Sequence, residues 1–422
     1  MRIIIAEGGP AENVGSMALI ENAIKIARMK FPESDLIVLT PTVPSVENSL
    51  KMDGVNGVKV LEDLFVPPPS KNSTFKKLLW LTSSLVWIFF VRFIQVLKIS
   101  PCIVSTGNRK KVLLEVKDAD YIFCIGAERI NDVFYKTVFL SLEALSIYQR
   151  MGKKMIHLSM TIGPLYYKFS MRKASKVLNN SHAVFVRDQI SFDWLSKLNV
   201  TKPLIYNSYD IAILQDKNTS SNQLLSEFKI SEGFIGVSFI EWAFRKVEGP
   251  VRMEGYTKAI AETLDYLIEK YHQQIVFIPT VVNAKSYKVD DVEACKRLKE
   301  LVKNKDRVSI IERLLSPGEM ATLFSYCKYS LVTRMHAAIL CSGAGGRPII
   351  TINYLYKLRE FMKNMEIENL SIDIDYINSK DLIALVESLN VNYDEYLSKN
   401  NLRMKQLQSK LLFDINKCFN SN

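Results

Sequence analysis

The 422-residue chain has few of the residues from which metal sites and disulfide frameworks are built. It contains six cysteines with no CxxC pair, and four histidines with no zinc-finger or helical pairing. These counts disfavour both kinds of site, so we expect no metal and no cofactor. The first nine residues have neither a basic n-region nor a cleavage site, which predicts no signal peptide. Internal repeats and low-complexity tracts are also absent from the sequence.

The composition is that of a folded protein, with 48% hydrophobic and 23% charged residues, and the length suggests two domains, possibly three. Lys and Arg number 55 against 44 Asp and Glu, a net charge of +11. That excess favours an anionic partner: nucleic acid, a phosphorylated metabolite or an acidic membrane face. The sequence carries no helix-turn-helix, RNA-recognition or zinc pattern, so we expect no nucleic acid.

Short apolar runs alternate with segments of helical period along most of the chain, which is typical of parallel βαβ units. We therefore expect an α/β protein of two Rossmann-like domains facing each other across a cleft, with ligands at the carboxyl ends of the strands. The expected parts are a first domain at residues 1–215, a polar linker at 216–232, a second domain at 233–378, and C-terminal helices at 379–422 able to pack back on the first domain.

One segment departs from this pattern by combining apolar and basic residues. The fourteen residues Leu78–Val91 carry no charge, whereas residues 71–117 hold nine Lys or Arg against one acid, a net +8. A helix of that length spans about 21 Å, short of the roughly 30 Å hydrocarbon core. Residues 78–97 thus predict a buried helix, an interfacial helix or a membrane span. We expect residues 71–117 to dock the protein on the inner face of the cytoplasmic membrane.

Candidate ligand-binding residues stand where strands end and helices begin. The turn Gly8–Ser16 offers backbone N–H groups to an anion, although it also suits a purely structural turn. Arg187 follows a buried strand, where a surface or capping role is the alternative. Arg334 and His336 follow another buried strand and could hold a carboxylate or phosphate and move a proton, or could serve only as a structural arginine and a capping histidine.

Several motifs share an order and spacing that resemble the polysaccharide pyruvyl transferase family over roughly residues 5–370. They are Asn13-Val14-Gly15, Ile162-Gly163-Pro164, Val186-Arg187-Asp188 with Ser191, Asp210-Ile211-Ala212, Ile278-Pro279, Arg334-Met335-His336-Ala337, and Pro348 through Tyr354-x-x-Lys357. The resemblance implies a fold like the two-domain glycosyltransferase B type. It also implies transfer of a pyruvyl group from phosphoenolpyruvate to sugar hydroxyls, forming a ketal on a cell-surface polysaccharide or its lipid-linked precursor.

The family's Arg-x-His pair, which binds the donor and serves catalysis, maps onto Arg334 and His336, and Arg187 matches a donor ligand. Two positions depart from the family pattern: Ser16 stands where many members carry Asp, and Gly126-Ala127-Glu128 stands where many carry a glycine run.

Phosphoenolpyruvate carries a carboxylate and a phosphate, so we expect Arg334, Arg187 and Lys357 to hold it. His336 is the expected acid or base, with Asp210 as its partner. The remaining residues expected to bind substrate are Tyr354, Asn13, Gly15 and Ser16. Two alternatives stay open: a nucleotide-sugar-dependent glycosyltransferase of the same fold type, and a non-catalytic, membrane-associated glycan-assembly protein.

Overall fold

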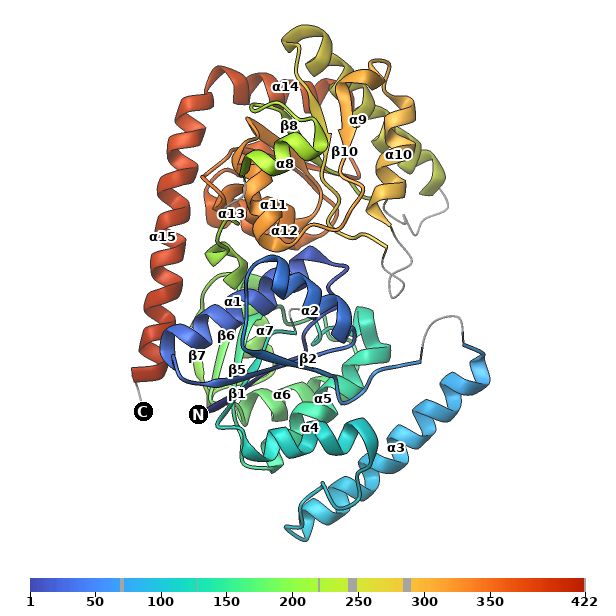
Figure 1. The fold of residues 1–422 in the computed structure, drawn as a ribbon, viewed down its shortest axis with the longest axis vertical. Coiled ribbons are helices and arrows are strands. Elements are labelled where there is room, and N and C mark those ends of the chain that lie inside the picture. The colour runs from blue at the N-terminus through green and yellow to red at the C-terminus, as the bar shows by residue number, and fades with distance from the viewer. Residues whose placement is uncertain (69–71, 127, 219–220, 242–248, 284–289, 421–422) are drawn as a thin grey trace. The chain divides into compact units, whose positions relative to one another are not determined.

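A computed structural model describes the chain except for residues 69–71, 127, 219–220, 242–248, 284–289 and 421–422 (Figure 1). The chain divides into two compact units. The first contains residues 1–11, 19–211 and 410–422, and the second contains residues 12–18 and 212–409. Each unit is therefore assembled from segments that are far apart in the sequence.

The first unit is built on a seven-stranded parallel sheet with the strand order β3-β2-β1-β4-β5-β6-β7. Strands in the middle of the sheet, such as β1 and β4, are largely apolar because helices cover both faces, with α1 and α2 on one face and α4, α5 and α6 on the other (Figure 1). The strands are β1 (Arg2–Ala6), β2 (Asp35–Thr40), β3 (Val58–Glu62), β4 (Tyr121–Cys124), β5 (Lys154–Met160), β6 (Ala183–Val186) and β7 (Leu204–Asn207). The helices are α1 (Val14–Lys30), α2 (Val43–Met52), α3 (Thr74–Val96), α4 (Gly107–Asp118), α5 (Tyr135–Arg150), α6 (Lys168–Asn179) and α7 (Gln189–Lys197), with the short 3-10 helix η1 (Asp132–Phe134).

The second unit repeats this plan with six parallel strands in the order β10-β9-β8-β11-β12-β13. Local signals set its elements: Ser316 and Glu319, for example, form a reciprocal capping box that begins α11 at Pro317. The strands are β8 (Ile235–Ser238), β9 (Ile275–Phe277), β10 (Val308–Ile310), β11 (Tyr329–Val332), β12 (Ile349–Asn353) and β13 (Ser371–Asp373). The helices are α8 (Ser221–Phe228), α9 (Gly249–Tyr271), α10 (Asp291–Leu301), α11 (Pro317–Ser325), α12 (Met335–Gly343), α13 (Tyr356–Met365) and α14 (Ser379–Val391), with η2 (Ile211–Leu214), η3 (Lys305–Arg307) and η4 (Glu368–Leu370). The last helix, α15 (Tyr393–Asn420), begins in this unit, and its residues from 410 onward belong to the first unit.

In both sheets the order of the strands reverses at one place. The reversal lies between β1 and β4 in the first unit and between β8 and β11 in the second. Loops that follow the two strands at such a point diverge to opposite faces of the sheet, which opens a crevice where ligands of α/β proteins bind. The expected fold class, two Rossmann-like α/β units, is confirmed. The stretch 216–232, expected as a linker, contains the helix α8, whose Leu224 is buried.

Helix α3 contains the uncharged run Leu78–Val91 and is 23 residues long, or about 34 Å. Ser73 caps its first turn, and Arg92, near its end, pairs with the buried Glu143 of α5. Only Ser84, Trp87, Ile88 and Val91 of this helix are buried. Figure 1 shows α3 at the periphery of the first unit, leading away from the sheet. By length and composition alone, α3 could cross a membrane.

Candidate functional site

Arg334 and His336 occupy the loop and first helical turn between β11 and α12, at the strand-order reversal of the second sheet. The loop is fixed at its start because Thr333 donates two hydrogen bonds to the Ser238 carbonyl, from its backbone N at 3.0 Å and from its Oγ1 at 2.7 Å. Arg334 then adopts an extended backbone at the N-cap position of α12. Its side chain, 23% exposed, is reachable from solvent.

Asp291 at the start of α10 holds Arg334 in place. Arg334 Nη2 donates to Asp291 Oδ1 at 2.6 Å, and the Asp291 carboxylate is fully buried. The other oxygen, Oδ2, accepts from Thr280 Oγ1 at 3.1 Å and from the backbone N of Val281 at 3.0 Å. A carboxylate fixed on both oxygens leaves the guanidinium little freedom. Asp291 therefore presents Arg334 in one orientation.

Sequence reasoning missed Asp291. The pair Asp290-Asp291 at a helix start is typical of an N-cap, and Asp290 does cap α10 by accepting from Val292 N at 2.9 Å. Nothing in the sequence distinguishes the capping aspartate from the one that turns toward Arg334.

The N-terminal turn contributes its residues 12–18 to the same unit. Asn13 forms an antiparallel bridge with Val281, and Val14 N donates to the Thr280 carbonyl at 3.0 Å. Thr280 and Val281, which Asp291 holds by hydrogen bonds, therefore also bind the start of α1. Asn13 Oδ1 accepts from Gly15 N at 3.0 Å, so its side chain shapes the turn.

Gly15 lies directly against the His336 ring. A Cβ atom at residue 15 would stand 2.2 Å from His336 Nδ1, which no real contact allows. Glycine is therefore required where the turn meets the imidazole. The structure brings together Asn13, Gly15, Arg334 and His336 from the predicted set, with Ser16 in the same turn, while their roles remain predictions.

Tyr354 and Lys357 follow β12, the strand next to β11, so they lie at the same carboxyl edge of the second sheet. Lys357 falls in the first turn of α13, where burial lowers the pKa of its ammonium group from 10.5 to about 8. A lysine with a pKa of about 8 is mostly protonated at neutral pH. The role of Lys357 stays a prediction.

Arg187 and Asp210 lie together in the first unit. Both are buried, at 4% exposure, and Arg187 Nη1 donates to Asp210 Oδ2 at 2.6 Å. Arg187 Nε donates to Thr161 Oγ1 at 2.8 Å. The structure thus shows Asp210 as the ion-pair partner of Arg187. The predicted roles of Arg187 as a donor ligand and of Asp210 in catalysis remain predictions.

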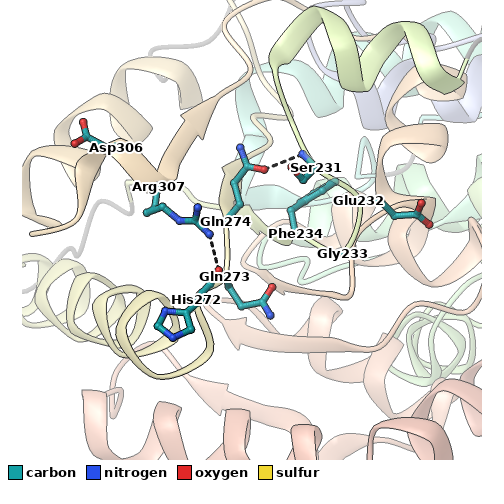
Figure 2. A pocket seen from close by; sticks show the side chains of 9 residues that line it. All are labelled: Ser231, Glu232, Gly233, Phe234, His272, Gln273, Gln274, Asp306 and Arg307. Carbon is teal, nitrogen blue, oxygen red and sulfur yellow. Dashed lines mark hydrogen bonds between the residues drawn. The ribbon is translucent and has the colours of Figure 1, made fainter.

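A small cavity of about 230 Å³ lies elsewhere in the second unit (Figure 2). Phe234, Gln274 and Arg307 in its lining directly precede β8, β9 and β10, so it sits at the amino edge of the sheet. Its polar groups bond to one another: Ser231 N donates to Gln274 Oε1 at 2.8 Å, and Arg307 donates to the His272 carbonyl. Its size and position both argue against a substrate site. Across the described ranges, no three His, Cys, Asp or Glu side chains gather as metal ligands would.

Comparison with solved structures places the fold among glycosyltransferases of the B type and nucleotide-sugar epimerases. Anabaena Alr3699/HepE in complex with UDP and glucose aligns with a TM-score of 0.54 and 13% identity, covering 100% of this chain and 98% of that one. The UDP-GlcNAc 2-epimerase of Methanocaldococcus jannaschii aligns with a TM-score of 0.51 and 15% identity, covering 92% and 91%. At these identities the likeness concerns the fold alone.

Sequence comparison is more specific. The amylovoran biosynthesis protein AmsJ of Erwinia amylovora is 23% identical over 288 residues, which cover 67% of this chain and 68% of AmsJ. The family model of polysaccharide pyruvyl transferases matches residues 13–356, a range that begins at Asn13 and includes Arg334 and His336. The chain therefore belongs to the polysaccharide pyruvyl transferase family, as its motifs predict.

Proposed function

We propose that this protein transfers a pyruvyl group from phosphoenolpyruvate to hydroxyls of a sugar in a cell-surface polysaccharide or its lipid-linked precursor, and closes a pyruvate ketal. The observation that carries the proposal is the buried Asp291 carboxylate, which fixes Arg334 next to His336 at the strand-order reversal of the second sheet. Membership of the family and the similarity to an amylovoran biosynthesis protein support it.

The chemistry suits these residues. A sugar hydroxyl adds to C2 of phosphoenolpyruvate while C3 takes a proton, which gives a methyl group and a phosphorylated adduct. A second hydroxyl then displaces the phosphate, which leaves as hydrogen phosphate with that hydroxyl's proton. Arg334 and Lys357 supply positive charge for the carboxylate and the departing phosphate, and His336 is the group proposed to deliver the proton to C3.

The direct test is release of phosphate from phosphoenolpyruvate, measured with methyl glycosides of glucose, galactose and mannose as acceptors. We expect His336→Ala to lower kcat at least 100-fold, the lower limit typical of a lost acid or base. Arg334→Ala should chiefly raise KM for phosphoenolpyruvate. Arg297→Ala, at an exposed arginine paired with Glu241, is the matched control. Turnover of a nucleotide sugar, with none of phosphoenolpyruvate, would refute the proposal.

We also propose that α3 docks the protein on an anionic membrane surface. Large apolar side chains, each at least 41% exposed, occur all along this helix: Phe75, Leu78, Leu79, Leu85, Val86, Phe89, Phe90, Phe93 and Val96. An apolar surface of that extent is rare on a soluble monomer and marks an interaction site. Exposed lysines accompany it, at residues 76, 77, 98, 110 and 111. Basic and apolar residues together fit an anionic lipid surface, where each cation contributes about 1 kcal/mol.

Flotation with vesicles of phosphatidylcholine and phosphatidylglycerol tests this second proposal. The wild type should float with vesicles containing anionic lipid at low salt, and the double variant Phe89→Asp/Phe93→Asp should stay at the bottom of the gradient. Phe413→Asp, at a 63% exposed phenylalanine of α15, is the control and should float like the wild type. A wild-type protein that ignores anionic vesicles at low salt overturns the docking proposal.

A further inference from the structure

Helix α3 is held against the first unit from its middle to its end, by contacts with α4 and α5. Arg109 of α4 donates from Nη2 to Ser84 Oγ at 2.7 Å. Farther along the helix, Gln95 Nε2 donates to the Ile147 carbonyl of α5 at 3.0 Å. A helix fixed in this way could cross a bilayer only by drawing charged residues of α4 and α5 into the hydrocarbon core, which is costly. These contacts favour an encounter with a membrane through one face of the helix.

Glu143 of α5 links α3 to α6 through two ion pairs. Its carboxylate is fully buried, and Oε1 accepts from Arg92 of α3 and, at 2.8 Å, from Lys173 Nζ of α6. Phe169, in the first turn of α6, also packs its ring against Phe139 of α5 at a centroid distance of 5.7 Å. Because one carboxylate oxygen binds both cations, α3 and α6 approach each other over α5. The exposed face of α6 is therefore a neighbour of the exposed face of α3.

Aromatic side chains are exposed at the start of α6 and in the turn before it. Tyr166 is 66% exposed, and Tyr167 and Phe169 are each 58% exposed. The backbone that carries the two tyrosines is fixed, because the buried Asp132 accepts on Oδ2 from Tyr166 N at 2.6 Å and from Tyr167 N at 3.0 Å. A single exposed apolar residue is ordinary, whereas three large rings beside the apolar face of α3 mark an interaction site.

The same face of α6 is strongly basic. The helix contains four Lys or Arg and no Asp or Glu, and the wider stretch of residues 144–186 also lacks acidic residues. Lys173 is occupied by its ion pair with Glu143. The other three cations of the helix are exposed, and their four-residue spacing places them on one stripe: Lys168, Arg172 and Lys176. A stripe of this kind favours an anionic partner.

We propose that α6 and the turn before it form a second membrane contact beside α3, with an anionic phospholipid surface as the partner. This inference rests on the proposed docking of α3 and deepens it. The stripe complements anionic headgroups, and the exposed rings suit the boundary between headgroups and acyl chains. Because α6 follows β5, it begins at the carboxyl edge of the first sheet, where ligands of α/β proteins bind. Two contacts fix the tilt of the first unit and bring this edge to the membrane, where a lipid-linked acceptor would be presented.

A fluorescent label at residue 167 tests the contact directly. All six cysteines of the chain are buried, so a thiol introduced on the surface can be labelled selectively. Tyr167→Cys is compared with Lys51→Cys, at an exposed lysine of α2 on the opposite face of the first sheet (Figure 1). Each variant carries nitrobenzoxadiazole and is mixed at low salt with vesicles of phosphatidylcholine and phosphatidylglycerol. The emission of the label at residue 167 should brighten and shift to the blue as the label leaves water, and that of the label at residue 51 should not. No response at residue 167, in protein that sediments with the vesicles, overturns the inference.

Charge reversal gives an independent test with the same vesicles. Arg172→Glu should raise the Kd about fivefold or more, because it removes one cation from the stripe and adds an acid. Lys51→Glu makes the same change in net charge and should leave the Kd within about twofold of the wild type. Circular dichroism should show both variants folded. Equal weakening by the two variants would mean that only the net charge matters, and it would overturn the inference.

Failure of the α3 docking has a different signature. A wild-type protein that binds no anionic vesicles removes both membrane contacts at once. Wild-type binding that Phe89→Asp/Phe93→Asp loses, with no response at residue 167 and no effect of Arg172→Glu, keeps the docking of α3 and removes the contact through α6. A label at residue 167 that responds to the methyl glycosides and not to vesicles assigns the surface to a sugar, and the inference is then wrong.

Discussion

Replacement of Glu7 by glutamine should change the stability of the protein in a way that depends on pH. Glutamine has nearly the shape of a protonated glutamate and never ionises. Below about pH 4.5 the Glu7 carboxyl is protonated in both the folded and the unfolded chain, so the two proteins should have similar free energies of unfolding. Between pH 4.5 and 7 only the unfolded chain loses the proton, and unfolding of the wild type becomes progressively easier.

The size of the effect follows from the burial of Glu7. Its pKa rises from 4.5 to about 7 on folding, and each pKa unit corresponds to about 1.4 kcal/mol. Above pH 7 both states are ionised and the difference levels off. Glu7→Gln should therefore be more stable than the wild type by about 3 kcal/mol at pH 8 and by less than about 1 kcal/mol at pH 5. Because the carboxylate is 5% exposed, solvent screens little of this difference.

Urea unfolding of the full chain, followed by circular dichroism at pH 5, 6, 7 and 8, measures the difference. Titrating groups that are remote from Glu7 behave alike in the two proteins and cancel in the comparison. Glu33→Gln, at an exposed position, should track the wild type at each pH. A stability difference that stays constant from pH 5 to pH 8 would show that Glu7 ionises normally, and it would refute the reasoning.

Three further outcomes test the site in the second unit. Asp291→Ala removes the buried partner of an arginine and three further hydrogen bonds, so urea unfolding should show a loss of about 3–5 kcal/mol, whereas a loss under 1 kcal/mol would contradict the anchoring role. Gly15→Ala should displace His336 and lower kcat for phosphate release at least tenfold, while Gly255→Ala, where a Cβ meets nothing within 4 Å, should leave kcat unchanged. Lys357 loses its charge as pH rises through about 8, so KM for phosphoenolpyruvate should increase above that pH in the wild type, and Lys357→Arg should remove this increase.

The local order of the chain could be predicted because each element carries its own signal. A buried apolar strand followed by Thr333, Arg334 and a largely apolar segment predicts both the strand end and the helix start, and the structure has β11 and α12 there. The pairing of distant segments could not be predicted in this way. Gly15 reads as an ordinary turn glycine until the fold places it against the His336 ring.

The burial of Glu7 could not be predicted from the sequence for the same reason. A glutamate after a short strand is typical of a solvated loop, and its burial depends on Gly126 from another strand. For helix α3 the sequence left a buried helix, an interfacial helix and a membrane span open. Phe89 is 67% and Phe93 is 58% exposed, which disfavours the buried helix. Helix formation follows from local sequence, whereas burial depends on which neighbours the fold supplies.

The end of α15 has a consequence for how the protein is made. Phe419 packs its ring against Phe31, Tyr121 and Phe123 at centroid distances of 5.4, 5.9 and 5.9 Å, all within the first unit. Residues 212–409 of the second unit are synthesised before this phenylalanine. During translation the first unit therefore lacks Phe419, and the aromatic side chains that contact it stay uncovered, until residues 212–409 have been synthesised. A fragment cut at residue 211 would remain in that unfinished state.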